Sequence, residues 1–190
     1  MPTLILKWDS AHLDAIVSRG LEPALLKAVM YAGRDALRTL TSASKKGARA
    51  RKKLKARRVS EALAPHGPHS PRALEEMVWR LEISGAPVPL EDYPHSGGAH
   101  GRPLVVQVNV GKKVMVKGLF EAVMKSGHKG IFLRKGAERF PIKEAFSTNV
   151  ANVVGDLHED LFNAAQNAFD VTFERVMKAE VDKALSSHHG

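Results

Sequence analysis

LVVQVNVGKKVMVKG, residues 104–118, is the stretch of sequence that decides the fold. A run rich in β-branched, apolar residues stands on each side of Gly111-Lys112, and such residues are typical of strands. The Gly-Lys pair fits a tight turn. The stretch therefore predicts a β-hairpin.

Further strands are predicted on both sides of this hairpin. Residues 76–84 alternate apolar and polar side chains, and residues 131–135, three apolar residues followed by Arg134 and Lys135, are predicted as another strand. Pro141 marks a pairing at 140–142 as short or at an edge. Residues 120–125 fit either the end of a strand or a short helix. Together these segments predict a central antiparallel β-sheet.

Long amphipathic helices are predicted before and after the sheet. Residues 23–43 place apolar side chains at steps of three and four, with Pro23 near the first turn. Gly47 argues for a break or a kink beyond this helix. A second helix is expected over residues 155–185. Helices, then an antiparallel sheet, then a helix indicate an α+β fold.

The remaining segments are predicted as follows. Residues 3–8 form a short strand or extended arm, residues 9–19 a short helix, and 147–149 a polar connection. Pro- and Gly-rich residues 64–71 and 86–103 are expected to be exposed loops. The 190 residues suit a single domain. Its parts are an N-terminal arm at 1–20, the helix and basic segment at 21–63, loops and a strand at 64–103, a β core at 104–154, and the C-terminal helix at 155–186.

Composition excludes several classes of protein. The sequence has no Cys, which rules out disulfides, thiolate zinc sites and a Cys nucleophile. No long apolar stretch follows Met1, so we expect no signal peptide. No run approaches the ~20 apolar residues of a membrane-spanning helix. We therefore expect a soluble globular protein.

The positive charge is concentrated in one segment. Lys and Arg number 29 against 20 Asp and Glu, a formal net charge of +9. One segment holds nine cations and no acid, and the rest of the chain has 20 charges of each sign. This basic segment consists of Lys45, Lys46, Arg49, Arg51, Lys52, Lys53, Lys55, Arg57 and Arg58.

The basic segment has two interpretations. A run of charges often forms an ordinary solvated helical face. An uninterrupted basic block also fits a polyanion, here DNA or an acidic partner protein. No aromatic residue is interleaved, so we do not expect stacking on single-stranded bases. Any contact with DNA would be with phosphates and would carry no sequence information.

No group of residues in the sequence indicates catalysis, a cofactor or a metal. Two histidine pairs, His66 with His69 and His95 with His100, match no helix-borne metal motif. Neighbouring carboxylates do not point at one reacting centre. Gly111-Lys112 lacks the rest of a phosphate-loop motif. We expect a non-enzymatic protein without catalytic, cofactor-binding or metal-binding residues.

Three motifs together resemble the minor tail protein Z family of tailed phages and prophages, also called tail-completion proteins. The first is an Ala-rich amphipathic helix that runs into the basic segment and ends in LKARRVSEAL, residues 54–63. The second comprises WRLEISGAPVPLEDY, residues 79–93, and the hairpin stretch. The third is GIFLRKGAERFPIKEAFSTNV, residues 130–150, and its RFPIKEAFSTNV segment, residues 139–150, which follows the strands, is the most specific part of the resemblance. The resemblance covers residues 21–185, and the role of the loop at 86–102 stays open.

The resemblance implies a single tail-completion domain, a structural virion protein that completes the phage tail at the head–tail junction, or neck. It implies a homo-oligomeric ring around the DNA path, on sixfold tail symmetry, with no enzyme activity and no cofactor. Its partners would be further copies of the chain, the tail terminator or tail tube, the head–tail connector and the phage DNA. It would be assembled in the bacterial cytoplasm and would contact no membrane. The basic segment alone supports an alternative, a stand-alone DNA-binding protein without sequence specificity.

Overall fold

The computed structural model describes residues 3–6, 22–69, 76–98, 102–134, 136 and 141–186. The chain forms two compact units. The helical unit consists of Pro2–Ser44, Leu63–Glu82 and Leu157–Gly190, and the β unit of Lys45–Ala62 and Ile83–Asp156. None of the helices within the described ranges is long and apolar enough to cross a membrane.

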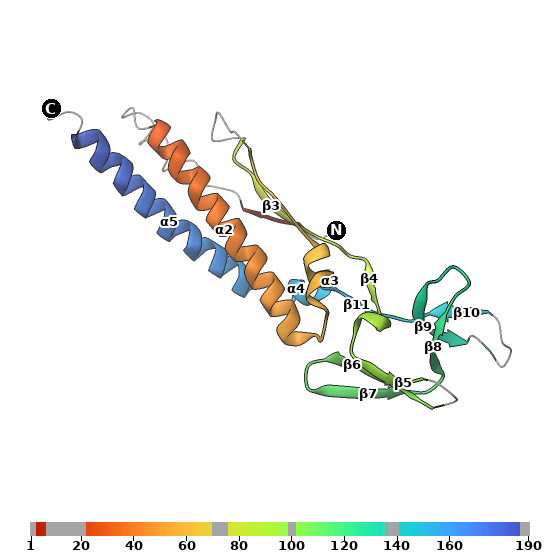
Figure 1. The fold of residues 1–190 in the computed structure, drawn as a ribbon. Coiled ribbons are helices and arrows are strands. Elements are labelled where there is room, and N and C mark those ends of the chain that lie inside the picture. The colour runs from red at the N-terminus through yellow and green to blue at the C-terminus, as the bar shows by residue number, and fades with distance from the viewer. Residues whose placement is uncertain are drawn as a thin grey trace. The chain divides into compact units, whose positions relative to one another are not determined.

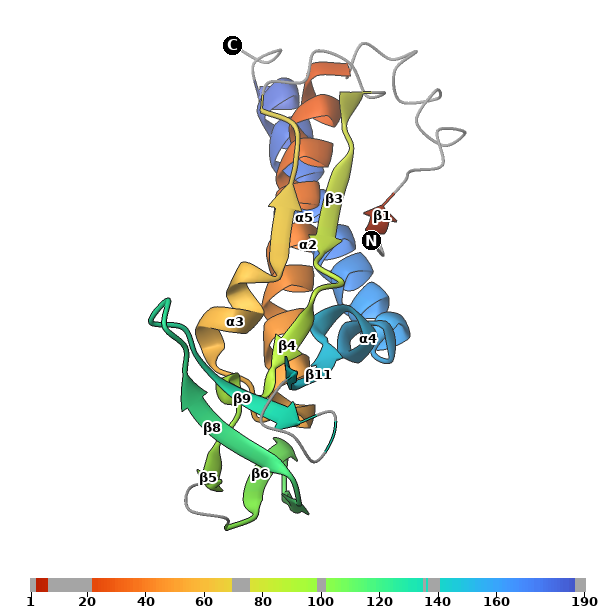
Figure 2. The ribbon, with the colours of Figure 1, turned by 90° about the vertical axis from the view of Figure 1, so that its right-hand side faces the viewer.

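Two long helices form one layer of the helical unit. These are α2 (Glu22–Arg51), of which the residues up to Ser44 belong to this unit, and α5 (His158–Ser186). They lie side by side in both views (Figures 1 and 2). The hydroxyl of Thr172 on α5 donates a 2.8 Å hydrogen bond to Asp35 Oδ2 on α2. Thr172 is buried, so the bond satisfies a polar group that would otherwise be costly inside the unit.

A small sheet packs on this helix pair through Trp79. The sheet has the order β1–β3–β2, formed by β1 (Thr3–Leu6), β3 (Trp79–Ile83) and β2 (Leu63–His66). The Trp79 side chain is 1% exposed. It lies in an apolar cluster with Met77 and with residues of both helices, which are Leu25, Val29 and, partly buried, Leu26, Met30, Leu37, Phe173 and Met177.

Gly33 on α2 lies directly against the ring of Trp79. A Cβ atom at this position would overlap three carbon atoms of the indole, Cε2, Cζ2 and Cδ2. A helix interior normally disfavours glycine relative to alanine. Here the missing side chain lets the indole ring of Trp79 approach the helix backbone.

Within the residues that the structure describes, the β unit contains three small sheets and three short helices. One sheet pairs β4 (Pro87–Pro89) with β11 (Phe146–Asn149), and the other two have the orders β5–β6–β7 and β10–β9–β8. The strands of these two sheets are β5 (His95–Gly97), β6 (Leu104–Asn109), β7 (Lys112–Val116), β8 (Leu119–Val123), β9 (Lys129–Arg134) and β10 (Ile142–Glu144). The helices are α3 (Ala56–Glu61), the 3-10 helix η2 (Leu90–Asp92) and α4 (Val150–Gly155).

The strand β4 has an unusual composition. Pro87 and Pro89 have no backbone N–H, so Val88 is the only donor that the strand possesses. Prolines in sheets are confined to edges and irregular positions, and β4 indeed has β11 as its single partner. Asn149 ends β11 and caps α4, because its side-chain oxygen accepts the backbone N–H of Asn152 at 2.8 Å.

The α+β class and the hairpin are confirmed. Long helices stand before and after the strands, and β6 and β7 pair antiparallel. The turn between them lies at Val110-Gly111, one residue earlier than the predicted Gly111-Lys112. Residues 120–125 extend a strand, β8, rather than starting a helix. β10 is an edge strand, as Pro141 indicated. The strands are divided among four small sheets, where the sequence suggested one central sheet.

Other local predictions were wrong. Gly47 does not break α2, which continues to Arg51 because Ala, Lys and Arg on both sides favour helix. Two expected loops contain strands: β2 begins at Leu63, and residues 86–103 include β4, η2 and β5. Pro65 fits because β2 is an edge strand.

At the C-terminal side, the expected connection at residues 147–149 belongs to β11, and the long helix is preceded by the separate α4. The helix expected at 9–19 lies outside the described residues.

Replacing Gly33 with Ala should destabilise the helical unit by about 1–3 kcal/mol, because the new methyl group displaces Trp79. The matched control is Gly155→Ala in α4, where an added Cβ meets no atom within 4 Å. The control should be neutral or slightly stabilising, since Ala is the better helix former. Urea unfolding followed by circular dichroism measures both, and an equal response would contradict the proposed packing.

Candidate nucleic-acid interface

The basic segment belongs entirely to the β unit. Its first four cations lie on the last turns of α2, the next three on the link at residues 52–55, and the last two on α3. Lys45 and Lys52 are half-buried and the other seven are exposed. The helical conformation before and after the link follows from the Ala, Lys and Arg content.

Asp92 holds the end of the basic segment. The Asp92 side chain is only 11% exposed and contacts two cations. Arg58 Nε donates to Asp92 Oδ2 at 2.6 Å, and Lys55 Nζ lies 3.3 Å from Asp92 Oδ1. A nearly buried carboxylate needs such partners, because an unpaired charge in this position would be strongly unfavourable. The contact therefore joins α3 to η2.

Three further cations of the basic segment contact residues of the β unit. Arg57 Nε donates to Glu61 Oε1 at 2.6 Å, and this hydrogen bond lowers the pKa of the Glu61 carboxyl. Arg51 lies 3.5 Å from Asp156. Lys52 Nζ donates to Asn109 Oδ1 at 2.6 Å. Exposed ion pairs of this kind contribute little stability, so Arg51 and Arg57 remain able to exchange partners.

Four cations of the basic segment have no ion pair with any residue in the described part of the chain. They are Lys45, Lys46, Arg49 and Lys53. The structure thus separates the nine sequence-predicted residues into five that contact other groups of the β unit and four that are free to meet an external anion.

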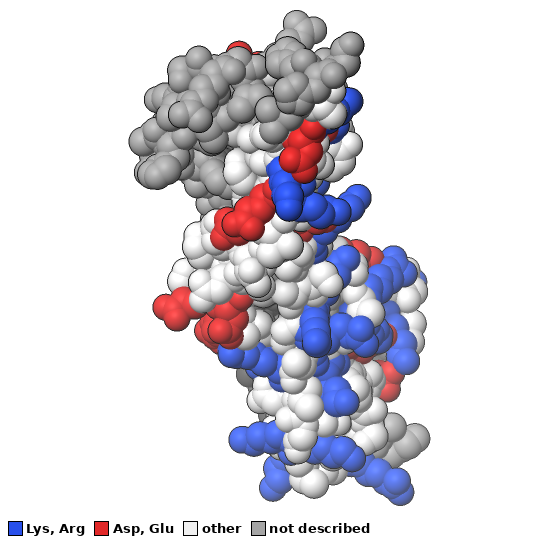
Figure 3. Space-filling view, turned by 90° about the vertical axis from the view of Figure 1, so that its left-hand side faces the viewer, with Lys and Arg blue, Asp and Glu red and all other residues white. Residues whose placement is uncertain are grey.

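The two units carry opposite net charges. The β unit has 19 Lys and Arg against seven Asp and Glu, whereas the helical unit has ten against 13. Figure 1 places β6 and β7 at the bottom of the view, and the same end of Figure 3 shows Lys and Arg side chains and, among the residues coloured there, no acid. The basic segment therefore lies in a unit that is basic as a whole.

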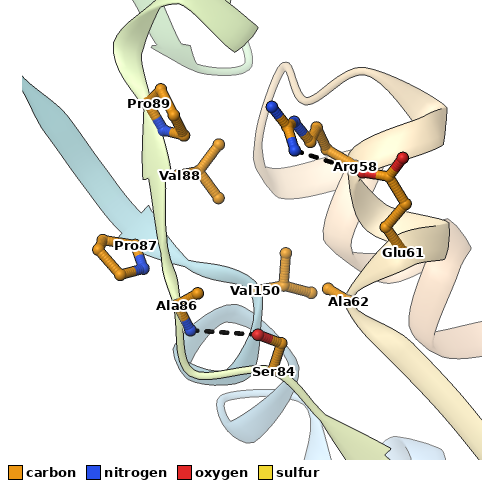
Figure 4. A pocket seen from close by; sticks show the side chains of 9 residues that line it. All are labelled: Arg58, Glu61, Ala62, Ser84, Ala86, Pro87, Val88, Pro89 and Val150. Carbon is orange, nitrogen blue, oxygen red and sulfur yellow. Dashed lines mark hydrogen bonds and ion pairs between the residues drawn. The ribbon is translucent and has the colours of Figure 1, made fainter.

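A small pocket beside Arg58 offers no reactive group. Its lining comes from α3, from β4 and the residues before it, and from Val150 (Figure 4). The Arg58 guanidinium contacts Glu61 as well as Asp92. The hydroxyl of Ser84 accepts the backbone N–H of Ala86 at 3.3 Å. The charged and hydroxyl groups of this pocket are therefore already engaged with the protein.

The histidines do not form a metal site within the described residues, where no group of three potential ligands occurs. His66 Nε2 lies 3.4 Å from Glu82, and His95 Nδ1 lies 2.7 Å from the carbonyl oxygen of Tyr93. His100 lies outside the ranges that the structure describes.

Sequence reasoning missed Asp92 and Asn109 as contacts of the basic segment. Asp92 is next to Glu91 in a Pro-rich stretch, which made both residues look like exposed loop acids. The available signal was the flanking apolar residues of PVPLEDY, which indicate a segment packed against the rest of the unit.

Comparison with family models found no match, and neither did searches among curated proteins and solved structures.

Replacing Asp92 with Asn should lower the free energy of unfolding by about 1–3 kcal/mol, because two charge-assisted contacts are lost. Glu91→Gln removes the same charge one residue away, at a side chain without an ion pair in the described structure, and should change stability little. Chemical denaturation of both variants measures the difference. Equal stabilities of the two variants would show that Asp92 does not hold the basic segment.

Proposed function

We propose that this chain is a structural protein of tailed phage virions that completes the tail at the head–tail junction by forming a ring around the DNA path. The observation that carries the proposal is the resemblance at residues 130–150. The described part of this stretch forms β9, β10, β11 and the first residue of α4. It contributes to two sheets and caps a helix, so the most specific motif is also a central part of the β unit.

The opposite charges of the two units support ring formation. A closed ring needs a heterologous contact, in which one surface of a copy meets a different surface of the next copy. Each copy carries +9 overall, and a contact between the β unit (+12) of one copy and the helical unit (−3) of the next is the pairing of units with the most favourable charges. Two identical surfaces of the β unit would repel each other.

The ring would act by position, with no catalytic step and no cofactor. Its neighbours would be the tail terminator or tail tube on one side and the head–tail connector on the other. In this arrangement the free cations of the basic segment meet either the DNA in the channel or an acidic neighbour. The protein would be part of the virion after assembly in the bacterial cytoplasm.

A second candidate function is favoured by the four free cations. Without any ring, Lys45, Lys46, Arg49 and Lys53 suit a protein that binds duplex DNA through phosphates alone. Four phosphate contacts would give a slope of about −3.6 for log affinity against log salt. This candidate would be favoured if the chain binds duplex DNA and remains monomeric in the presence of tail proteins.

Native mass spectrometry tests the first proposal. In the presence of the tail-terminator protein of the same phage, the chain should form closed oligomers of about six copies. Raising the salt from ~50 mM to ~500 mM should weaken the assembly, because salt screens the attraction between the two units. Two results together would overturn the proposal. The chain would remain monomeric with the terminator, and tails that lack the protein would join heads no better after its addition than after addition of buffer.

A further inference from the structure

Two acid-free stretches of the sequence meet in the β unit. Residues 36–60 contain no Asp or Glu, and this range includes the whole basic segment. Residues 93–120, which include the β6–β7 hairpin, also contain no acid, and they hold Arg102, Lys112, Lys113 and Lys117. The second stretch was not part of the predicted site.

Backbone hydrogen bonds join the two stretches. The N–H of Lys53 donates to the carbonyl oxygen of Val108 at 2.9 Å, and the N–H of Val110 donates to that of Arg51 at 3.2 Å. Between them, Lys52 forms an antiparallel bridge with Asn109. The link after α2 therefore runs antiparallel to the end of β6, to which an isolated bridge at Lys52 joins it.

This pairing sets two lysines in one row. Asn109 is opposite Lys52 on one side and opposite Lys112 on the other. Residues opposite each other in adjacent strands lie ~5 Å apart and point to the same face, so the two lysines flank Asn109 at ~10 Å from each other. The hydrogen bond from Lys52 Nζ to Asn109 Oδ1 agrees with this common face.

The residue after each of these two lysines, in the link and in β7, is also a lysine, and it points to the opposite face. Lys53 follows Lys52 and Lys113 follows Lys112, and successive side chains of a strand alternate between faces. Both faces of the hairpin end, around the turn at Val110-Gly111, are therefore basic. Lys53, Lys112 and Lys113 are exposed, and none of them has an ion pair with a residue that the structure describes.

Lysines on an edge strand also discourage unwanted strand pairing, and β7 is an edge strand. That role requires charge along one edge only. Here cations from a second segment, Lys52 and Lys53, are brought to the same end of the hairpin by hydrogen bonds. Protection of the edge strand against unwanted pairing does not account for these additional cations.

We propose that the end of the β6–β7 hairpin and the basic segment form one continuous surface that binds the phosphate backbone of duplex DNA without sequence specificity. The inference rests on the proposed function, in which the basic segment meets DNA or a neighbouring protein. Cations on both faces of the hairpin end suit duplex DNA. The major groove of DNA admits a two-stranded β-ribbon, and a phosphate backbone lies on each side of the groove. A flat acidic protein surface would contact one face only.

The test compares two double variants of equal charge. Lys112→Gln with Lys113→Gln removes two cations of the proposed surface. The matched control, Lys125→Gln with Lys143→Gln, removes two exposed lysines elsewhere in the β unit, which also lack an ion pair with any described residue. Fluorescence anisotropy measures binding to a short labelled duplex between about 50 and 200 mM salt, the range in which phosphate contacts change affinity strongly. Urea unfolding of all three proteins verifies that the variants are folded.

The hairpin variant should reduce the magnitude of the log–log salt slope by about 2 and weaken binding by ~10-fold or more at low salt. The control should leave the slope unchanged. Equal slopes for the two variants, or no duplex binding by the unmodified chain at ~50 mM salt, would overturn the inference. If the hairpin variant binds DNA normally but no longer forms oligomers in native mass spectrometry, the hairpin end contacts a protein instead, and the inference is rejected. Oligomers that form normally while DNA binding is absent would leave the proposed ring intact and reject only this inference.

Discussion

One carboxylate, that of Asp92, fixes the end of the basic segment, and the position of α3 depends on it. Nine cations close together in sequence repel each other and would by themselves favour an extended, solvated chain. Asp92 is nearly buried and binds two of them, Arg58 and Lys55, which fixes α3 against η2. The free cations nearer the start of the segment are then presented from an ordered backbone. Preorganised charges bind a partner at a smaller entropic cost than flexible ones.

The predictable part of the fold came from periodicity, and the rest was set by long-range contacts. The long helix α2, the hairpin and the strand at Trp79 follow from local apolar patterns. The short strands β2, β4 and β11 have no such pattern, since they contain prolines or polar residues and exist because a partner strand lies beside them. Gly47 misled for a local reason: the helix-favouring residues on both sides of it outweigh a single unfavourable propensity.

The candidate site was predictable as a set of residues but not as a surface. Counting charges identified all nine cations. It did not reveal which of them are engaged, because Asp92 and Asp156 are distant from the segment in sequence and close only in the folded unit. Charge counting also did not connect the segment with Lys112 and Lys113. These lysines lie near Lys52 and Lys53 because backbone hydrogen bonds join the link to the hairpin. Electrostatic surfaces are properties of the fold as much as of the composition.

The two prolines of β4 have a consequence for a chain that would assemble in many copies. A strand from a neighbouring copy adds to a sheet only where it finds free backbone donors and acceptors. Pro87 and Pro89 leave β4 with Val88 as its single backbone donor, so an incoming strand finds carbonyl acceptors there but cannot complete a regular ladder of hydrogen bonds. Identical chains crowded together would therefore associate through side-chain surfaces rather than exchange strands at this position. Aggregation by open-ended pairing of strands would compete with closed assembly, and Pro87 and Pro89 oppose it at this edge.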